Sequence, residues 1–421
     1  MRSSLLLLLA TLGATPGLAQ TTPESYNLLA DVRYLASDQL AGRITGSPGA
    51  DSAAEFIARR FGQVGLQPSS TGWFQPFTVP RDAPAVAQLH LGELKGRNVI
   101  GVLPGRDPVL RNEIVIVGAH YDHLGMGGPG SGALDPDVNG QVHNGADDNA
   151  SGAAALIHIA SRLAQQPPGR TIVFIAFSGE ELGLLGSTYY VKHPLYPLAS
   201  TLAMVNLDMV GRLRNKRLIV YGVETAKEFP ALLDSLNWYG GFDLKKSGDG
   251  YGPSDQQSFF VAKRPVLHVF TDLHEDYHRS SDDWDKINAD GLVRVADYTA
   301  SIVRALADRT TPLTFVDAAP PDPHAGAVVT PGYGAYLGTV PDMSENPGGV
   351  GISGVRAGSP AELGGLRAGD ILVRIGDKAI LDLQGMTDAL RSHKADDRVE
   401  IEYIRDNAHH TVTVTLGTRP N

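Results

Sequence analysis

Two adjacent glutamates, Glu180 and Glu181, follow the apolar run 171–177 and are flanked by Gly179 and Gly183. The run has the length and the β-branched content of a buried strand. Two carboxylates at the end of such a strand are costly unless a nearby group favours negative charge. A metal ion and a water molecule that must lose a proton both favour it. The pair therefore points to metal-assisted hydrolysis, provided that other ligands lie close.

Four further short segments place acidic residues or histidines after an apolar run or before a helix. They are 118–123 with His120 and Asp122, 144–152 with Asp147 and Asp148, 206–211 with Asp208, and 277–283 with His278. In extended backbone His120 and Asp122 face the same side, and a carboxylate beside a histidine is the usual outer partner of a metal-bound imidazole. The alternatives are a hydrogen-bonded loop for this pair and a helix N-cap for Asp147 and Asp148, although capping needs only one acidic residue.

Other histidines compete for the role of ligand. His123, His143 and His274 lie near the acidic segments, and His274 precedes His278 by only four residues. His158 falls in an alanine-rich helix candidate and His268 within an apolar strand, which predicts that both are packing residues.

Predicted strands and helices alternate along the chain around these segments. Strands are expected at 98–105, 113–118, 171–177, 202–209, 217–221 and 263–270, and helices at 151–163 and 291–307. This alternation predicts an α/β fold with a mostly parallel central sheet flanked by helices on both faces. In such sheets functional sites form beyond the carboxyl ends of the strands, where the acidic and histidine segments fall.

Composition excludes several classes of protein. The chain has 421 residues and a formal net charge of -10, which argues against a nucleic-acid partner and against a polybasic membrane contact. Residues 1–20 have a charged start, a short apolar core and small residues at their end. This pattern predicts a signal peptide and an exported protein, periplasmic or secreted from a bacterium. No run is long enough to span a bilayer.

Cysteine is absent from the chain. Its absence excludes disulfides, thiolate zinc sites and cysteine nucleophiles. Any metal ion must therefore be held by histidines and carboxylates.

Five motifs, taken in order, resemble peptidase family M28, the di-zinc peptidases that include the bacterial leucyl-type aminopeptidases. They are His120-x-Asp122, Gly145–Gly152, Gly179–Ser187, Asn206–Met209 and Tyr277-His278. Five motifs in one order are far more specific than any one of them. The resemblance covers roughly residues 25–308 and implies a fold of zinc-exopeptidase type. It also implies a metal-dependent aminopeptidase that removes N-terminal residues from peptides.

The resemblance implies a set of metal ligands. His120 and Asp208 would bind one zinc ion, Glu181 and His278 would bind a second, and Asp148 would bridge the two. Histidine and carboxylate ligands suit zinc, with Co²⁺ or Mn²⁺ as substitutes.

The remaining motif residues would carry out the reaction. The resemblance implies that Glu180 is the general base for the bridging water and that Asp122 orients the first histidine. Tyr277 would donate a hydrogen bond to the tetrahedral intermediate. Ser254 and Asp255 resemble the loop beside the substrate pocket. The residue after them is glutamine where the family commonly has histidine, which leaves the side-chain preference open.

The chain is expected to divide into a signal peptide and two domains. We place the signal peptide at 1–20, the M28-type domain at 23–310, a proline-rich linker at 311–328 and a small β-rich domain at 329–418. The last unit contains Ser359-Pro360-Ala361, Gly365-Leu366 and Gly369–Leu372, a pattern similar to PDZ domains of bacterial proteases.

A PDZ domain binds an extended peptide, often a C-terminus, as an added strand. The resemblance implies that backbone N–H groups near Tyr336, Leu337 and Gly338 capture the terminal carboxylate. The alternative is a structural β-domain with a closed groove.

Three other functions remain open at this point. The same scaffold could serve as a carboxypeptidase or dipeptidase, or as a glutaminyl cyclase, which uses one zinc ion. The chain could also be a non-catalytic protein that binds peptides through its PDZ domain. The direction of cleavage, the number of zinc ions and chelator-sensitive hydrolysis distinguish these alternatives.

Overall fold

The computed structural model describes residues 23–79, 94–128, 131–135, 140–248, 250, 254–317, 335–341, 349–355, 358–380, 385–386, 389–390 and 392–417. The predicted signal peptide and residues 318–328 of the predicted linker lie outside these ranges. No helix among the described residues is long and apolar enough to cross a membrane.

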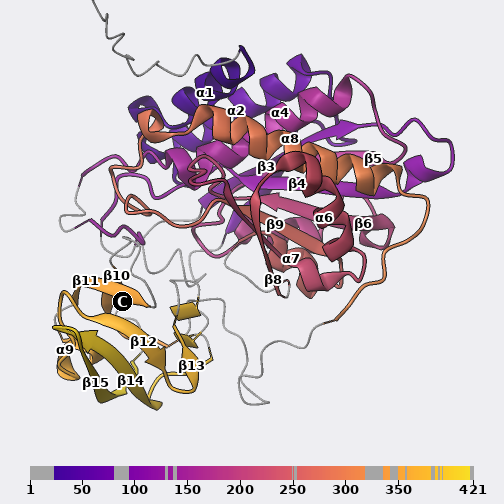
Figure 1. Ribbon diagram of the computed structural model, residues 1–421. Coiled ribbons are helices and arrows are strands. Elements are labelled where there is room, and N and C mark those ends of the chain that lie inside the picture. Colours follow the sequence, from indigo (N-terminus) through magenta and orange to yellow (C-terminus); the bar gives the residue numbers. More distant parts are fainter. Residues whose placement is uncertain are drawn as a thin grey trace, which may run out of the picture.

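A nine-stranded sheet forms the centre of the larger domain (Figure 1). Its strands are β1 (Gln67–Pro68), β2 (Phe74–Val79), β3 (Leu94–Leu103), β4 (Ile114–His120), β5 (Thr171–Phe177), β6 (Thr201–Leu207), β7 (Arg217–Tyr221), β8 (Asp243–Ser247) and β9 (Val266–Phe270). Their order is β1-β3-β5-β4-β6-β9-β7-β8, with β2 also paired to β3. The central strands β5, β4, β6 and β9 are parallel, whereas β3 pairs antiparallel with β5, and β7 with β9. The predicted parallel arrangement holds at the centre of a sheet that is mixed as a whole.

Strand β4 shows why the sheet is covered on both faces. Val115 and Val117 pack into one hydrophobic core, while Ile114 and Ile116 pack into another. Successive residues of a strand point to opposite faces, so a continuous apolar run requires a core on each side.

Helices supply the other half of each core. On one face lie α1 (Pro23–Leu35), α2 (Pro48–Gln63), α4 (Gly152–Ala164), α6 (Phe229–Gly240) and α8 (Ala289–Asp308). The opposite core contains side chains of α5 (Leu185–Lys192) and α7 (Gln256–Val261). Helix α8 buries Leu292, Val295 and Ala296 at the three- and four-residue spacing of one helical face. The Asn288 side chain caps this helix by accepting from the Gly291 N–H.

The C-terminal domain has a core of its own. Its six-stranded sheet contains β10 (Thr339–Pro341), β11 (Val350–Val355), β12 (Ile371–Ile375), β13 (Lys378–Ala379), β14 (Arg398–Arg405) and β15 (Ala408–Thr415), all paired antiparallel. The short helix α9 (Pro360–Leu363) adds Ala361 to a core built around Ile352, Leu372 and Ile401. This core shares no residue with those of the larger domain. These antiparallel strands agree with the predicted β-rich, PDZ-like domain.

Candidate metal centre and active site

The candidate ligands follow the carboxyl ends of four neighbouring strands. Strand β4 ends at His120, β5 leads into the glutamate pair, Asp208 follows β6 directly, and β9 leads to the loop that carries His278. Because β5, β4, β6 and β9 are adjacent and parallel, these ends meet at one edge of the sheet. Asp148 joins them from η3 (Ala146–Ser151), an irregular turn that precedes α4.

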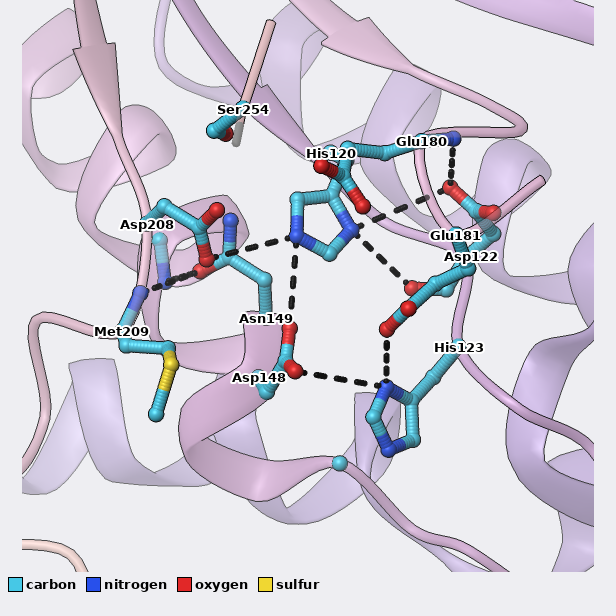
Figure 2. Close-up of polar contacts among 12 residues, drawn as sticks. His120, Asp122, His123, Asp148, Asn149, Glu180, Glu181, Asp208, Met209 and Ser254 are labelled. Carbon is cyan, nitrogen blue, oxygen red and sulfur yellow. Dashed lines mark hydrogen bonds and ion pairs between the residues drawn. The ribbon is translucent and has the colours of Figure 1, made fainter. Parts of the chain in front are cut away.

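His120, Asp148 and Asp208 form the first cluster of donor atoms. The Nε2 atom of His120 lies 3.3 Å from Asp148 Oδ1 and 3.3 Å from Asp208 Oδ1 (Figure 2). Two ligand atoms that share a tetrahedral zinc ion, each at about 2.1 Å, lie roughly 3.4 Å apart. The observed spacing therefore fits shared coordination of one cation.

His278, Asp148 and Glu181 form a second cluster. The Nε2 atom of His278 lies 3.3 Å from Asp148 Oδ2 and 3.3 Å from Glu181 Oε2. Asp148 thus turns one carboxylate oxygen toward each histidine. This is the arrangement that a carboxylate bridging two metal ions requires.

The charges in this buried region also favour cations. The carboxylates of Asp122, Asp148 and Glu181 are almost fully buried. Burial alone would raise the pKa of Asp148, but the imidazoles of His123, His120 and His278 hold that pKa well below its usual range. A cluster of buried carboxylates is stable only where positive charge compensates it. The donor set of imidazole nitrogens and carboxylate oxygens fits zinc.

Glu180 differs from its neighbour in its surroundings. Its pKa lies well above the usual range, chiefly because burial disfavours the charged form, and because Glu181, Asp208 and Asp255 are negative, while His120 opposes the shift. Its carboxylate lies within 4.8 Å of donor atoms of His120 and Glu181. A raised pKa suits a carboxylate that must take up a proton near neutral pH.

Asp122 connects the first histidine to the turn that carries Glu180. The closest contact of His120 Nδ1 is the Asp122 backbone carbonyl at 3.2 Å, with the carboxylate farther away at 3.8 Å. The carboxylate accepts hydrogen bonds from the Glu180 N–H at 3.2 Å and from the Thr45 hydroxyl at 3.1 Å. Asp122 therefore contacts His120 chiefly through its backbone, whereas its side chain holds the glutamate turn, and its predicted role in orienting His120 stays a prediction.

Two of the three competing histidines pair with aspartates that are not candidate ligands. His274 Nε2 lies 3.1 Å from Asp147 Oδ2, and His143 Nε2 lies 2.7 Å from Asp135 Oδ2. His123 is the exception, because its Nδ1 atom lies 2.7 Å from Glu181 Oε1 inside the second cluster. These three histidines could not be separated from the sequence, since all lie beside the same motif loops.

Asp147 and Asp282 hold the turn that carries the bridging aspartate. Asp282 Oδ2 accepts hydrogen bonds from the backbone N–H groups of Asp147 and Asp148, at 2.9 and 3.1 Å. Asp147 Oδ1 accepts from the Gly211 N–H at 2.6 Å and from the Ser151 hydroxyl at 2.9 Å. Both aspartates therefore connect loops that bear candidate ligands.

Arg43 is a structural residue of the site that the motif analysis missed. Its fully buried guanidinium donates to the carbonyls of Tyr121 (2.8 Å), Asn144 (2.6 Å), Gly145 (3.1 Å) and Leu35. Burial lowers the pKa of Arg43 to about 10. The residue ends η1 (Asp38–Arg43), far in sequence from the loops that it joins, and no local pattern marks it.

The predicted substrate residues lie beside this centre. Ser254 Oγ accepts a hydrogen bond from Asn206 Nδ2 at 2.8 Å, and burial raises the pKa of the neighbouring Asp255 to about 7. The ring of Tyr277 stacks on His278, with centroids 3.9 Å apart. Their roles toward a substrate remain predictions.

The predicted peptide-binding residues of the small domain precede its edge strand, β10. Leu337 is buried, and its carbonyl accepts from the Ala361 N–H at 2.8 Å, whereas the Tyr336 N–H donates to the Gly417 carbonyl. Gly338 has a φ of +85°, and a Cβ atom there would lie 2.2 Å from Ser359 Cβ, so this position requires glycine. In the described part of the chain β10 pairs with β11 only.

Comparison with known families assigns both domains. Residues 98–303 match peptidase family M28, and residues 335–416 match the PDZ domain family. The chain carries an M28 peptidase domain followed by a PDZ domain. The M28 domain is 29% identical over 230 residues to aminopeptidase YwaD of Bacillus subtilis, an alignment that covers 52% of this chain and 47% of the relative. The chain spans about half the length of the curated relatives it matches.

Solved structures share the fold of the M28 domain. A zinc aminopeptidase from Bacillus subtilis superposes with a TM-score of 0.55 at 18% identity, covering 68% of this chain and 96% of that one. A glutaminyl cyclase from Bacteroides thetaiotaomicron gives 0.54 at 19% identity, covering 66% and 97%. At these identities the likeness establishes the fold and leaves the reaction to the residues of the site.

Proposed function

We propose that this chain is an exported di-zinc aminopeptidase that hydrolyses the first peptide bond of its substrates. One observation carries the proposal: the two carboxylate oxygens of Asp148 each lie 3.3 Å from a different histidine, His120 on one side and His278 on the other. The similarity of the M28 domain to aminopeptidase YwaD supports the choice among peptidases.

The five candidate ligands and Glu180 would have different roles. His120, Asp148 and Asp208 would hold one zinc ion, and Asp148, Glu181 and His278 the other. When bound, the pair of ions would polarise the substrate carbonyl and lower the pKa of the attacking water. Glu180 would accept the proton of that water and pass it to the leaving amine. The pKa of Glu180, raised chiefly by burial, favours uptake of the proton from that water.

Substitution of each glutamate tests this division. We expect Glu180→Gln to lower kcat by about 10²- to 10⁴-fold while two zinc ions per chain are retained. The matched variant Glu181→Gln should lose zinc, because it removes a charged ligand. Atomic absorption measures the zinc content of each variant, and hydrolysis of aminoacyl anilides measures its kcat. Loss of zinc from Glu180→Gln would contradict the assigned roles.

The direction of cleavage and the number of zinc ions separate this proposal from its alternatives. Incubation with a mixed peptide library, read by mass spectrometry, should yield products shortened only at the N-terminus. Shortening from the C-terminus would indicate a carboxypeptidase. A single zinc ion per chain together with ring closure of N-terminal glutamine would indicate a glutaminyl cyclase, whose fold this domain shares.

Export and peptide binding complete the proposal. The charged and apolar pattern of residues 1–20 supports export, which the N-terminal sequence of protein recovered from the periplasm or medium would test. The PDZ domain would bind extended peptides or protein C-termini along β10, whose second edge is unpaired in the described part of the sheet.

A further inference from the structure

His123 lies inside the second cluster but differs from the candidate ligands in its contacts. It is completely buried, three residues after His120. Its Nδ1 atom lies 2.7 Å from Glu181 Oε1 (Figure 2). The other oxygen, Glu181 Oε2, lies 3.3 Å from His278 Nε2. The two oxygens of Glu181 therefore face two different imidazoles at two different distances.

The shorter distance identifies a hydrogen bond. A separation of 2.7 Å is typical of an N–H group that donates to a carboxylate, and it is well below the roughly 3.4 Å expected between two ligands of one tetrahedral zinc ion. His123 Nδ1 also lies 3.9 Å from Asp148 Oδ2, too far for a hydrogen bond. Because an ionised carboxylate only accepts, Nδ1 must carry the hydrogen.

The His123 ring is held firmly in this orientation. It lies edge-on to the His278 ring, with centroids 5.8 Å apart. On its other side is the backbone of Gly145, where a Cβ atom would come within 2.5 Å of the His123 ring carbons. The Nε2 atom is buried and has no hydrogen-bond partner in the described part of the protein. Among the residues that the structure describes, Glu181 makes the only polar contact with this ring within hydrogen-bond distance.

We propose that His123 is a positioning residue that fixes the Glu181 carboxylate through the Nδ1–H···Oε1 hydrogen bond and so sets the affinity of the second metal site. With Oε1 occupied, Oε2 is directed toward His278 and the ion that Asp148, Glu181 and His278 would share. The first site, of His120, Asp148 and Asp208, does not use Glu181. Loss of His123 should therefore weaken one metal site selectively. This inference rests on the proposed di-zinc function.

The test compares His123→Asn with His123→Leu in the zinc-loaded enzyme. The amide nitrogen of asparagine can replace Nδ1 as a donor, whereas leucine fills the space without one. Titration with a chromophoric chelator gives the affinity of each zinc ion, and thermal unfolding confirms that each variant folds. Replacing an outer partner of a ligand costs about 10- to 100-fold in metal affinity. We expect His123→Leu to lower the affinity of the second zinc site by this factor and to leave the affinity of the first site unchanged. His123→Asn should recover most of the lost affinity.

Three results would overturn the proposal. Unchanged affinities in both variants would show that the hydrogen bond has no role in metal binding. Equal weakening of both sites by leucine would indicate a general structural role. Loss of the second ion from both variants alike would indicate that His123 is itself a ligand. A wild-type enzyme that binds fewer than two zinc ions would instead refute the proposed function.

Discussion

The carboxylate of Asp282 accepts a hydrogen bond from the backbone N–H of Asp148 at 3.1 Å. It also accepts from the N–H of Asp147 at 2.9 Å. A residue four positions after one candidate ligand, His278, therefore fixes the backbone of another, which lies more than 130 residues earlier in the chain. The two loops that carry these candidate ligands are therefore joined by direct hydrogen bonds.

Removing the Asp282 carboxylate should make the position of Asp148 less well defined without changing any candidate ligand. We expect Asp282→Ala to lower kcat/KM and zinc affinity by about 10- to 100-fold, as for other outer partners of metal ligands. Asp282→Asn keeps one acceptor oxygen and should have a smaller effect. Chelator titration measures the zinc affinity of each variant, and anilide hydrolysis measures its kcat/KM. The exposed Asp285→Ala is the matched control, and equal losses in Asp282→Ala and Asp285→Ala would contradict the role given to Asp282.

Arg43 should be important for the stability of the same loops. Arg43→Met leaves four buried carbonyls without their donor, and each unsatisfied group costs about 1–3 kcal/mol. We expect the free energy of unfolding to fall by ~3 kcal/mol or more, and Arg43→Lys to recover only part because its single ammonium cannot span the same carbonyls. Urea unfolding measures the change. The exposed Arg59→Met on α2 should stay within about 0.5 kcal/mol, and a similar small change for Arg43→Met would refute this assignment.

The strands that lead to the candidate ligands could be predicted because each leaves a local pattern. The range predicted for β5 is the observed one, Thr171–Phe177, since a strand buried on both faces is a continuous apolar run. The position of Asp148 followed from its motif. The supporting residues could not be predicted in this way. Arg43 binds backbone carbonyls 78 and 102 residues away, and any residue type supplies a carbonyl, so the sequence carries no sign of the contact.

The edges of the sheet were also beyond prediction. β4 and β5 are parallel, but β3 and β7 run antiparallel to the neighbours that join them to the parallel strands. Strand direction depends on the path of the connecting loops, which apolar periodicity does not encode. The prediction of the site does not depend on these edge strands, because the candidate ligands follow the parallel central strands.

His268 should make stability depend on pH. It is buried in β9, where its Nδ1 atom lies 3.2 Å from Asn206 Nδ2, and burial lowers its pKa from 6.5 to about 4. Between these values the unfolded chain binds a proton that the folded chain does not, so stability falls as the pH falls from about 6.5 toward 4. The full effect is up to ~3 kcal/mol. We expect His268→Gln to be less sensitive than the wild type across this window in urea unfolding. Parallel curves for the two proteins would contradict the buried neutral imidazole.

Asp370 provides a test of whether the two domains are energetically separate. It is fully buried in the PDZ domain, where its carboxylate accepts from Arg405 Nε at 2.6 Å and Nη2 at 2.7 Å, and from the Arg367 N–H at 2.8 Å. Asp370→Ala removes the buried carboxylate that pairs with the partly exposed Arg405 guanidinium and should destabilise this domain by ~2–4 kcal/mol. Because the two domains have separate cores, hydrolysis of aminoacyl anilides should be unchanged, while hydrogen exchange quickens only in the PDZ strands. The control is Glu400→Ala, since Glu400 is exposed and forms a surface ion pair with Arg374. This variant should change neither hydrolysis nor hydrogen exchange. A parallel loss of hydrolysis in Asp370→Ala would show that the PDZ domain supports the catalytic fold directly.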